Sequence, residues 1–178
     1  MSHPAQQEFV SRLKDKLPTH FEDKTVLEVG SLDINGSIRE FFTNCNYTGI
    51  DIGEGPGVDI VCEGQNFEGD DCSYDVTCST ECFEHNPHWV GTFENMIRLT
   101  KNEGLVFFTC ATTGRAVHGT ENQYPHCSPL TIKKGWNYYK NLTEIDIREE
   151  FDIESIFSEY EFEVEDVSCD LYFWGLKK

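Results

Sequence analysis

The chain has 178 residues and a formal net charge of -18, from 32 acidic and 14 basic side chains. This length suits one domain with a full core, so we expect residues 1–178 to form a single domain. An acidic surface repels polyanions, which argues against nucleic acid as a substrate. No run approaches the roughly 20 apolar residues of a membrane helix, and no basic segment followed by an apolar one opens the chain. These features favour a cytoplasmic protein without membrane contact.

The predicted elements alternate between strands and helices. They begin with an amphipathic helix at 5–17, inside an N-terminal helical segment 1–20, and go on with strands at 24–29, 46–52, 58–62, 73–79 and 105–109 and helices at 37–42, opened by Asn35, 87–100 and 143–158. This alternation predicts an α/β doubly wound, mostly parallel sheet with helices on both faces. The last two strands, 161–167 and 169–176, are separated only by about Ser168. A crossover helix cannot fit there, so we expect an antiparallel hairpin over 160–177.

The eight cysteines are scattered through apolar runs and do not frame short loops. We therefore expect reduced thiols in the core. Cys72, Cys78, Cys82 and His85 lack a paired Cys-x-x-Cys spacing, so no metal site is predicted from them.

The connection at 112–141 is about twice as long as an ordinary one. Connections of that length are usually functional. We therefore interpret it as a loop or lid on the substrate side.

The segment 26–37 leads from an apolar strand into a turn with two glycines, Gly30 and Gly36. Glycines there allow positive φ and close approach to a ligand. The acidic Glu28 and Asp33 oppose a diphosphate ligand and favour a cationic one. Asp51 ends the next strand about 20 residues later, the spacing at which a carboxylate accepts both hydroxyls of an adenosine ribose. This spacing alone suits a dinucleotide equally well.

Several motifs in this order resemble those of class I S-adenosylmethionine-dependent methyltransferases, specifically their small single-domain members. The segments that carry the resemblance are 26–36, 47–51, 55–59, 75–85 and 101–105, and weaker similarity extends to about residue 147. The resemblance implies a Rossmann-like seven-stranded sheet of order 3-2-1-4-5-7-6 with an antiparallel last strand. It also implies S-adenosylmethionine as the cofactor. One departure is that Ser31 and Asp33 occupy a turn where the family commonly has a third glycine.

The resemblance also implies the residues of the cofactor site. Glu28, Gly30 and the following turn would surround the methionine part, and Asp51 would bind the ribose. The full candidate set for cofactor binding is Glu28, Gly30, Ser31, Asp33, Asn35, Gly36, Asp51, Ile52, Cys62, Glu63, Gly64, Ser79, Thr80 and Glu81.

Three residues are candidates for the catalytic side of the site: Glu81, His85 and His118. A histidine can act as a general base for a hydroxyl acceptor. His85 equally suits a structural role before Pro87, and His118 equally suits a mobile loop without catalytic side chains.

We predict methyl transfer to an oxygen or nitrogen of a small-molecule or glycan acceptor. Two alternatives remain open at this stage. An NAD(P)-dependent oxidoreductase shares this sheet, and a non-catalytic module could bind S-adenosylmethionine without an acceptor pocket. The sequence gives no prediction of oligomeric state.

Overall fold

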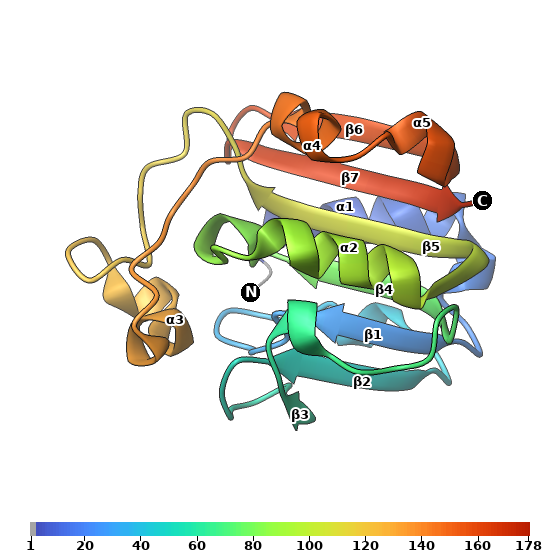
Figure 1. Ribbon diagram of the computed structural model, residues 1–178, viewed down its shortest axis with the longest axis horizontal. Helices are drawn as coiled ribbons and strands as arrows, with labels where there is room; N and C mark the ends of the chain where they lie inside the picture. Colours follow the sequence, from blue (N-terminus) through green and yellow to red (C-terminus); the bar gives the residue numbers. More distant parts are fainter. Residues whose placement is uncertain (1–2) are drawn as a thin grey trace.

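The computed structural model describes residues 3–178 and contains a seven-stranded sheet in the order β3-β2-β1-β4-β5-β7-β6 (Figure 1). The strands are β1 (Thr25–Val29), β2 (Asn46–Asp51), β3 (Ile60–Val61), β4 (Tyr74–Thr80), β5 (Thr100–Ala111), β6 (Phe157–Glu165) and β7 (Asp170–Lys177). The neighbouring pairs among β1 to β5 run parallel, and β7 is antiparallel to both β5 and β6. The predicted fold class, strand order and closing hairpin are confirmed.

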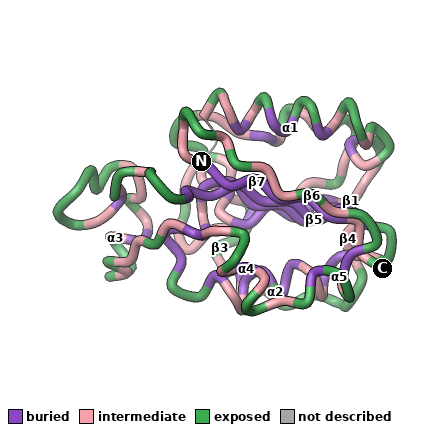
Figure 2. The backbone as a smooth tube through the Cα atoms, turned by 90° about the horizontal axis from the view of Figure 1, so that it is seen from above, coloured by how far each residue is buried: buried purple, intermediate pink, exposed green. Residues whose placement is uncertain are grey.

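Helices cover both faces of this sheet (Figure 2). On one face, α1 (Pro4–Lys16) buries Phe9, Val10 and Leu13, whose spacing of three and four residues forms a single helical stripe. The opposite face is covered by α2 (Trp89–Leu99), α4 (Glu144–Glu150) and α5 (Ile153–Ile156). The two apolar layers hold the strands in place. Because β1 pairs parallel with both β2 and β4, the carboxyl ends of these three strands meet at one edge of the sheet.

The predicted helix at 37–42 is wrong. Only a single 3-10 turn, η2 (Arg39–Phe41), forms there, and its N-cap is Ile38 instead of Asn35. Phe42 already has an extended backbone, and Thr43 exchanges backbone hydrogen bonds with Phe21 and Asp23. These contacts end the turn before a helix can grow.

The predicted helix at 143–158 is also wrong in its extent. Thr143 caps α4 as expected, through its hydroxyl and the backbone N–H of Asp146. The helix then stops because Phe151 is extended and stacks edge-on against Phe93, with ring centroids 4.9 Å apart. Asp152 caps the separate short helix α5, and β6 begins at Phe157, earlier than predicted.

Smaller boundary errors have local causes. The third strand shrinks to two residues. Before it, the N–H of Val58 donates to the carbonyl of Gly55 and the N–H of Asp59 donates to the carbonyl of Gly49. The helix predicted from residue 87 starts only at Trp89, after the turn η4 (Phe83–His85). Residues 101–104, predicted to connect helix and strand, belong to β5, which starts immediately after α2.

The eight thiols are free, but the prediction that all of them lie in the core is wrong. Cys78 and Cys110 are buried, Cys72 is exposed and the other five are half-buried. Among residues 3–178, no helix has the length and apolarity needed to cross a membrane.

Candidate active site

A cleft with about 610 Å³ of empty space, part of it open to solvent, lies at the carboxyl ends of β1, β2 and β4. Ligands of open α/β sheets bind at this edge. Seven of the residues predicted from sequence line it: Gly30, Asp51, Ile52, Cys62, Gly64, Glu81 and His85. Residues far apart in the chain therefore meet around one space.

Gly30 makes the turn that opens this cleft. Its φ is +80°, and a Cβ at this position would lie 2.6 Å from Cβ of Cys82. Both facts require glycine, because left-handed backbone and such close approach exclude a side chain. The glycine-containing turn therefore brings the chain after β1 directly against the chain after β4.

Asp51 is fixed by two backbone donors from different segments. The N–H of Leu32 donates to Oδ2 at 3.0 Å, and the N–H of Ile52 donates to Oδ1 at 2.7 Å. Burial raises the pKa of Asp51, and these two hydrogen bonds offset part of that rise. Each carboxylate oxygen keeps a further lone pair, so the group is oriented and still able to accept hydrogen bonds.

Glu28 points away from this space. It is buried within β1, and the hydroxyl of Tyr47 donates to its Oε2 at 2.9 Å. Burial raises the pKa of Glu28, and the Tyr47 hydrogen bond only partly opposes this. Among the described residues that line the cleft, Glu28 does not occur.

The other candidates from the turn after β1 do not line the cleft either. Ser31 is buried beside Gly49 of β2. Asp33 accepts a hydrogen bond from the N–H of Gly36 at 2.8 Å, and both residues line a separate shallow hollow shared with Arg39. Asn35, between them, is exposed. Asp33 and Gly36 therefore line a different hollow from Asp51.

Three further candidates lie beside the cleft without lining it. Ser79 and Thr80 are buried at the end of β4, where the Ser79 hydroxyl donates to the carbonyl of Val29 at 2.8 Å. Glu63 stands on the rim and accepts from the side-chain amide of Gln65 at 2.7 Å. The Ser79 contact links β4 to β1, and the Glu63 contact links two positions of one loop.

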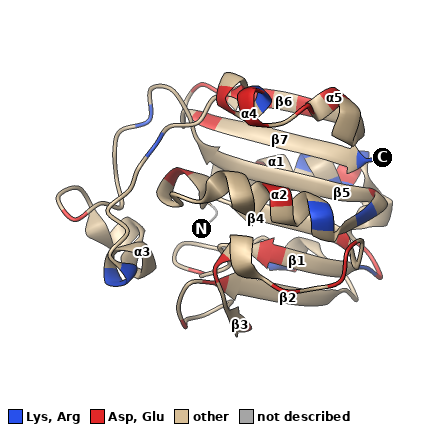
Figure 3. Ribbon diagram, in the orientation of Figure 1, with Lys and Arg blue, Asp and Glu red and all other residues tan. Residues whose placement is uncertain are grey.

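The long connection supplies one wall of the cleft through α3 (Pro129–Lys134). Leu130 on this helix packs against Gly53. A Cβ added at Gly53 would lie only 2.7 Å from Cδ2 of Leu130. The last turn of α3 carries Lys133 and Lys134, and this end of the helix is blue in Figure 3. The Nζ of Lys134 is 2.7 Å from Oε1 of Glu63. The helix is thus attached by a side-chain contact to the rim on the far side of the cleft.

Glu81 and His85 form the inner wall. Glu81 has a left-handed backbone with φ +50°, held by its N–H donating to the carbonyl of Thr109 at 2.9 Å. Such backbone in a non-glycine residue costs about 1–3 kcal/mol and concentrates at functional sites. Burial, followed by the repulsion of Glu84 and Asp170, raises the pKa of Glu81. Glu81 precedes the 3-10 turn η4, whereas His85 is its last residue.

His85 is buried and neutral. Burial, followed by repulsion from His118, lowers its pKa to about 3. The His118 ring stands edge-on to it, with centroids 4.9 Å apart. The approach of this loop depends on Gly119, whose φ is +64° and where a Cβ would lie 2.6 Å from Cε1 of His85.

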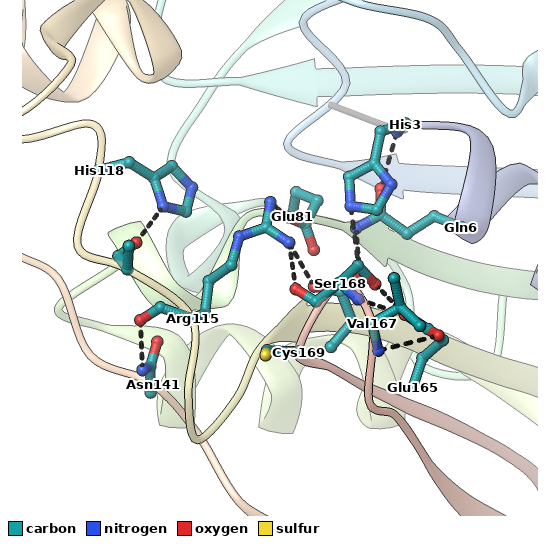
Figure 4. Close-up of polar contacts among 12 residues, drawn as sticks. His3, Gln6, Glu81, Arg115, His118, Asn141, Glu165, Val167, Ser168 and Cys169 are labelled. Carbon is teal, nitrogen blue, oxygen red and sulfur yellow. Dashed lines mark hydrogen bonds and ion pairs between the residues drawn. The ribbon is translucent and has the colours of Figure 1, made fainter.

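Behind this wall, Arg115 joins two buried carboxylates (Figure 4). Its Nη1 donates to Oδ1 of Asp170 at 3.1 Å, and its Nη2 lies 3.6 Å from Oε2 of Glu81. Oδ2 of Asp170 lies 3.1 Å from Nε2 of His3 and accepts a hydrogen bond from the Ser168 hydroxyl at 2.6 Å. The start of the long loop is therefore anchored to β7.

Sequence reasoning missed part of the site. The unforeseen lining residues are Val29, Leu32, Ile34, Cys82, Asn86, Cys127, Ser128, Pro129, Leu130, Thr131 and Trp136. Those before position 90 adjoin predicted strand ends, so neighbouring positions could have indicated them. Those after 126 belong to a loop whose length marked it as functional but whose direction no local pattern shows.

A family model described as a methyltransferase domain matches residues 1–167. The chain belongs to the methyltransferase domain family. This confirms the resemblance to the S-adenosylmethionine-dependent methyltransferases and decides against the oxidoreductase alternative. No protein of curated function matches the methyltransferase chain in sequence.

Solved structures share the fold of this methyltransferase. The 1,6-didemethyltoxoflavin-N1-methyltransferase of Burkholderia thailandensis, with S-adenosylhomocysteine bound, aligns with a TM-score of 0.61 at 13% identity, over 100% of this chain and 92% of that one. Phosphoethanolamine N-methyltransferase 2 of Haemonchus contortus, in complex with S-adenosyl-L-methionine, gives 0.66 at 14% identity, over 98% and 52%. The CurJ carbon methyltransferase gives 0.63 at 15% identity, over 97% and 53%.

Proposed function

We propose that this methyltransferase transfers the methyl group of S-adenosylmethionine to an oxygen or nitrogen of a small-molecule or glycan acceptor. The observation that carries the proposal is Asp51, whose two carboxylate oxygens are held at the cleft by the N–H groups of Leu32 and Ile52. A carboxylate oriented in this way suits the two hydroxyls of a ribose.

The lining of the cleft suits the rest of the cofactor. Gly30 leaves room for close approach, and a Cβ there would fill the turn. Cys62 and Gly64 flank the space beside Asp51, where the adenine would lie. Asp51 places a carboxylate in the lining of the cleft, which favours a cationic sulfonium and ammonium over a phosphate.

S-adenosylmethionine supplies a methyl group that is already activated, so the protein contributes mainly by positioning. Effective molarities on the order of 10⁵ M show what alignment alone can give. The α3 segment contributes Pro129 and Leu130 to the lining of the cleft. Glu81 Oε1 is buried on the inner wall without a hydrogen-bond partner within the described chain, so it can take a proton from an acceptor hydroxyl or ammonium.

The concave form of the cleft, lined both by strand ends and by α3, supports a small acceptor or a sugar in preference to a protein surface. Two structural neighbours are named for small acceptors, 1,6-didemethyltoxoflavin and phosphoethanolamine. The eight free thiols favour a reducing compartment, and we propose the cytoplasm.

The test is calorimetric titration of S-adenosylmethionine into the wild-type protein and into Asp51→Ala. Loss of two hydrogen bonds to a carboxylate, each worth about 1.5–3 kcal/mol, should weaken binding by about 10²-fold or more. Asp33→Ala is the matched control, because this carboxylate lies in the other hollow. Equal affinity of the wild type and Asp51→Ala would overturn the assignment.

The acceptor class is tested by transfer of labelled methyl from S-adenosylmethionine to pools of metabolites and of glycans. Labelled products should carry the methyl on oxygen or nitrogen. Binding without transfer to any pool would identify a non-catalytic module, and a product methylated on carbon would contradict the proposed acceptor atom.

A further inference from the structure

Glu84, His85 and His118, called here the triad, bring potential metal ligands together around His85, which lines the cleft. Their ligand atoms all lie within 4.8 Å of one another. Glu84 is fully buried and His85 is 3% exposed. Within residues 3–178, both oxygens of Glu84 and both ring nitrogens of His85 lack a hydrogen-bond partner.

This arrangement is costly unless a ligand completes it. Each buried polar group without a partner costs about 1–3 kcal/mol, and more when it is charged. Glu84 cannot move outward easily, since its carbonyl accepts from the N–H of Lys140 at 2.9 Å. Neutral His85 carries a proton on one of its ring nitrogens, so three of these four atoms are acceptors without a donor. They point to a missing ligand that binds acceptor atoms, which means a cation.

His118 is held in the form that a metal ligand needs. Its Nδ1 lies 3.0 Å from the carbonyl of Ala116 and donates to it, which leaves the lone pair on Nε2. Histidine ligands of metals characteristically donate their other N–H to a carbonyl or carboxylate in this way. The contact selects the tautomer before any ion arrives.

A second group of similar composition shows the contrast. His3, Glu81 and Asp170 also lie within reach of a common ion. There, however, Arg115 already supplies positive charge to both carboxylates, and the Ser168 hydroxyl donates to Asp170. In the triad, by contrast, no cation and no hydroxyl among the described residues contacts Glu84 or His85, whose side-chain oxygens and ring nitrogens all lack a hydrogen-bond partner.

We propose that the triad binds a divalent first-row transition-metal ion. Two imidazoles and one carboxylate suit Mn²⁺, Fe²⁺, Co²⁺ or Zn²⁺ better than Mg²⁺, which prefers an all-oxygen shell. Bonds of about 2.0–2.2 Å place neighbouring ligand atoms roughly 3–3.5 Å apart, so ligand atoms up to 4.8 Å apart must approach one another by up to about 1.3–1.8 Å. The spacing of the cysteines and His85 gave no indication of this ion, because His118 is 33 residues away from His85 in the chain.

The position of the triad gives the ion a role that rests on the proposed methyl transfer. Three protein ligands leave further coordination positions open. His85 itself lines the cleft, so an ion bound to it can present those positions to an acceptor. The ion then holds an oxygen or nitrogen of the acceptor beside the cofactor site.

The test is titration of Co²⁺ into the full, untagged, metal-free protein without S-adenosylmethionine, followed by visible absorption and calorimetry. One ion should bind per chain, with d–d bands of mixed nitrogen and oxygen ligation. His118→Gln should weaken binding by about 10-fold or more, the lower end of what even an outer-shell change costs. His126→Gln is the matched control, because this histidine lies in the same loop but is exposed and contacts Tyr124.

Glu84→Gln provides a second variant that keeps the shape of the side chain, and thermal melting of each variant checks that it folds. Absence of Co²⁺ binding by the wild type at millimolar concentration, or equal binding by His118→Gln and the wild type, would overturn the proposal. S-adenosylmethionine affinity is measured separately without metal. Its loss would count against the proposed function, whereas loss of Co²⁺ binding alone counts only against the metal site.

Discussion

Lys134 on α3 lies 2.7 Å from Glu63 on the opposite rim of the cleft and holds the long loop across the site. The Lys134 side chain is 41% exposed and that of Glu63 22%. An ion pair of this kind contributes about 0.2–1 kcal/mol, too little to affect global stability. It is nevertheless enough to change how often the loop is closed.

Lys134→Ala should therefore weaken S-adenosylmethionine binding by about 1.5- to 5-fold, with the melting temperature unchanged. Limited proteolysis within 112–141 should become faster, because the segment is released more often. Lys133→Ala removes the same charge one position away and should leave both measurements at the wild-type level. Equal protease sensitivity of the two variants would contradict a closing role for Lys134.

Gly30→Ala should destabilise the protein by about 2–4 kcal/mol. The left-handed backbone costs an alanine about 1 kcal/mol, and the overlap with Cys82 adds about 1–3 kcal/mol. Gly135→Ala is the control, since it has a similar φ of +83° but no atom within 4 Å of the added Cβ. Urea denaturation should show a clearly larger loss of unfolding free energy for Gly30→Ala than for Gly135→Ala.

Glu28→Gln separates the two roles that sequence and structure suggest for this residue. Burial raises the pKa of Glu28. A raised folded pKa means that stability is greatest below the ordinary value of 4.5 and is lost as pH rises through the folded pKa. The amide cannot ionise, so Glu28→Gln should gain stability relative to the wild type between pH 4 and pH 7.

Because Glu28 does not line the cleft in the part of the chain described, the same variant should bind S-adenosylmethionine within about twofold of the wild type. A loss of 10-fold or more would instead support the direct cofactor role expected from sequence. Chemical denaturation across pH and calorimetry at pH 7 provide the two readouts.

We expect Asp75 to contribute to the loss of folding stability at acid pH. Partial burial opposes its ionisation, but hydrogen bonds from Thr25 and Lys101 outweigh this and lower the pKa of Asp75 to about 2. The folded pKa is depressed from 3.8, so the stabilisation is present above about pH 4 and is lost as pH falls through 2.

The effect should amount to about 2 kcal/mol at neutral pH. Asp75→Asn removes the titrating group, so its unfolding free energy should depend less steeply on pH between 4 and 2 than that of the wild type. Identical slopes in that range would show that Asp75 does not contribute.

The path of the long loop at 112–141 explains why some of the functional residues were not predicted from sequence. His85 and His118 belong to segments with no shared periodicity, and they meet only because the long loop returns to the end of β4. The run from Glu81 to His85, by contrast, was visible as two carboxylates and an imidazole at a strand end. Glu84 within that run could have been chosen from sequence, but its burial could not.

The sequence by itself determined the strands, the glycine turn after β1, Asp51 at the end of β2 and the closing hairpin. Each depends on periodicity, turn chemistry or connection length within a few residues, which local physics fixes. Only the tertiary structure decided that Glu28 faces Tyr47, that Asp33 lies outside the cleft and that α3 reaches Glu63. These depend on which side chains the sheet order and the loop path bring together. The triad belongs to this second group, because its ligands converge from separate segments whose packing no local pattern encodes.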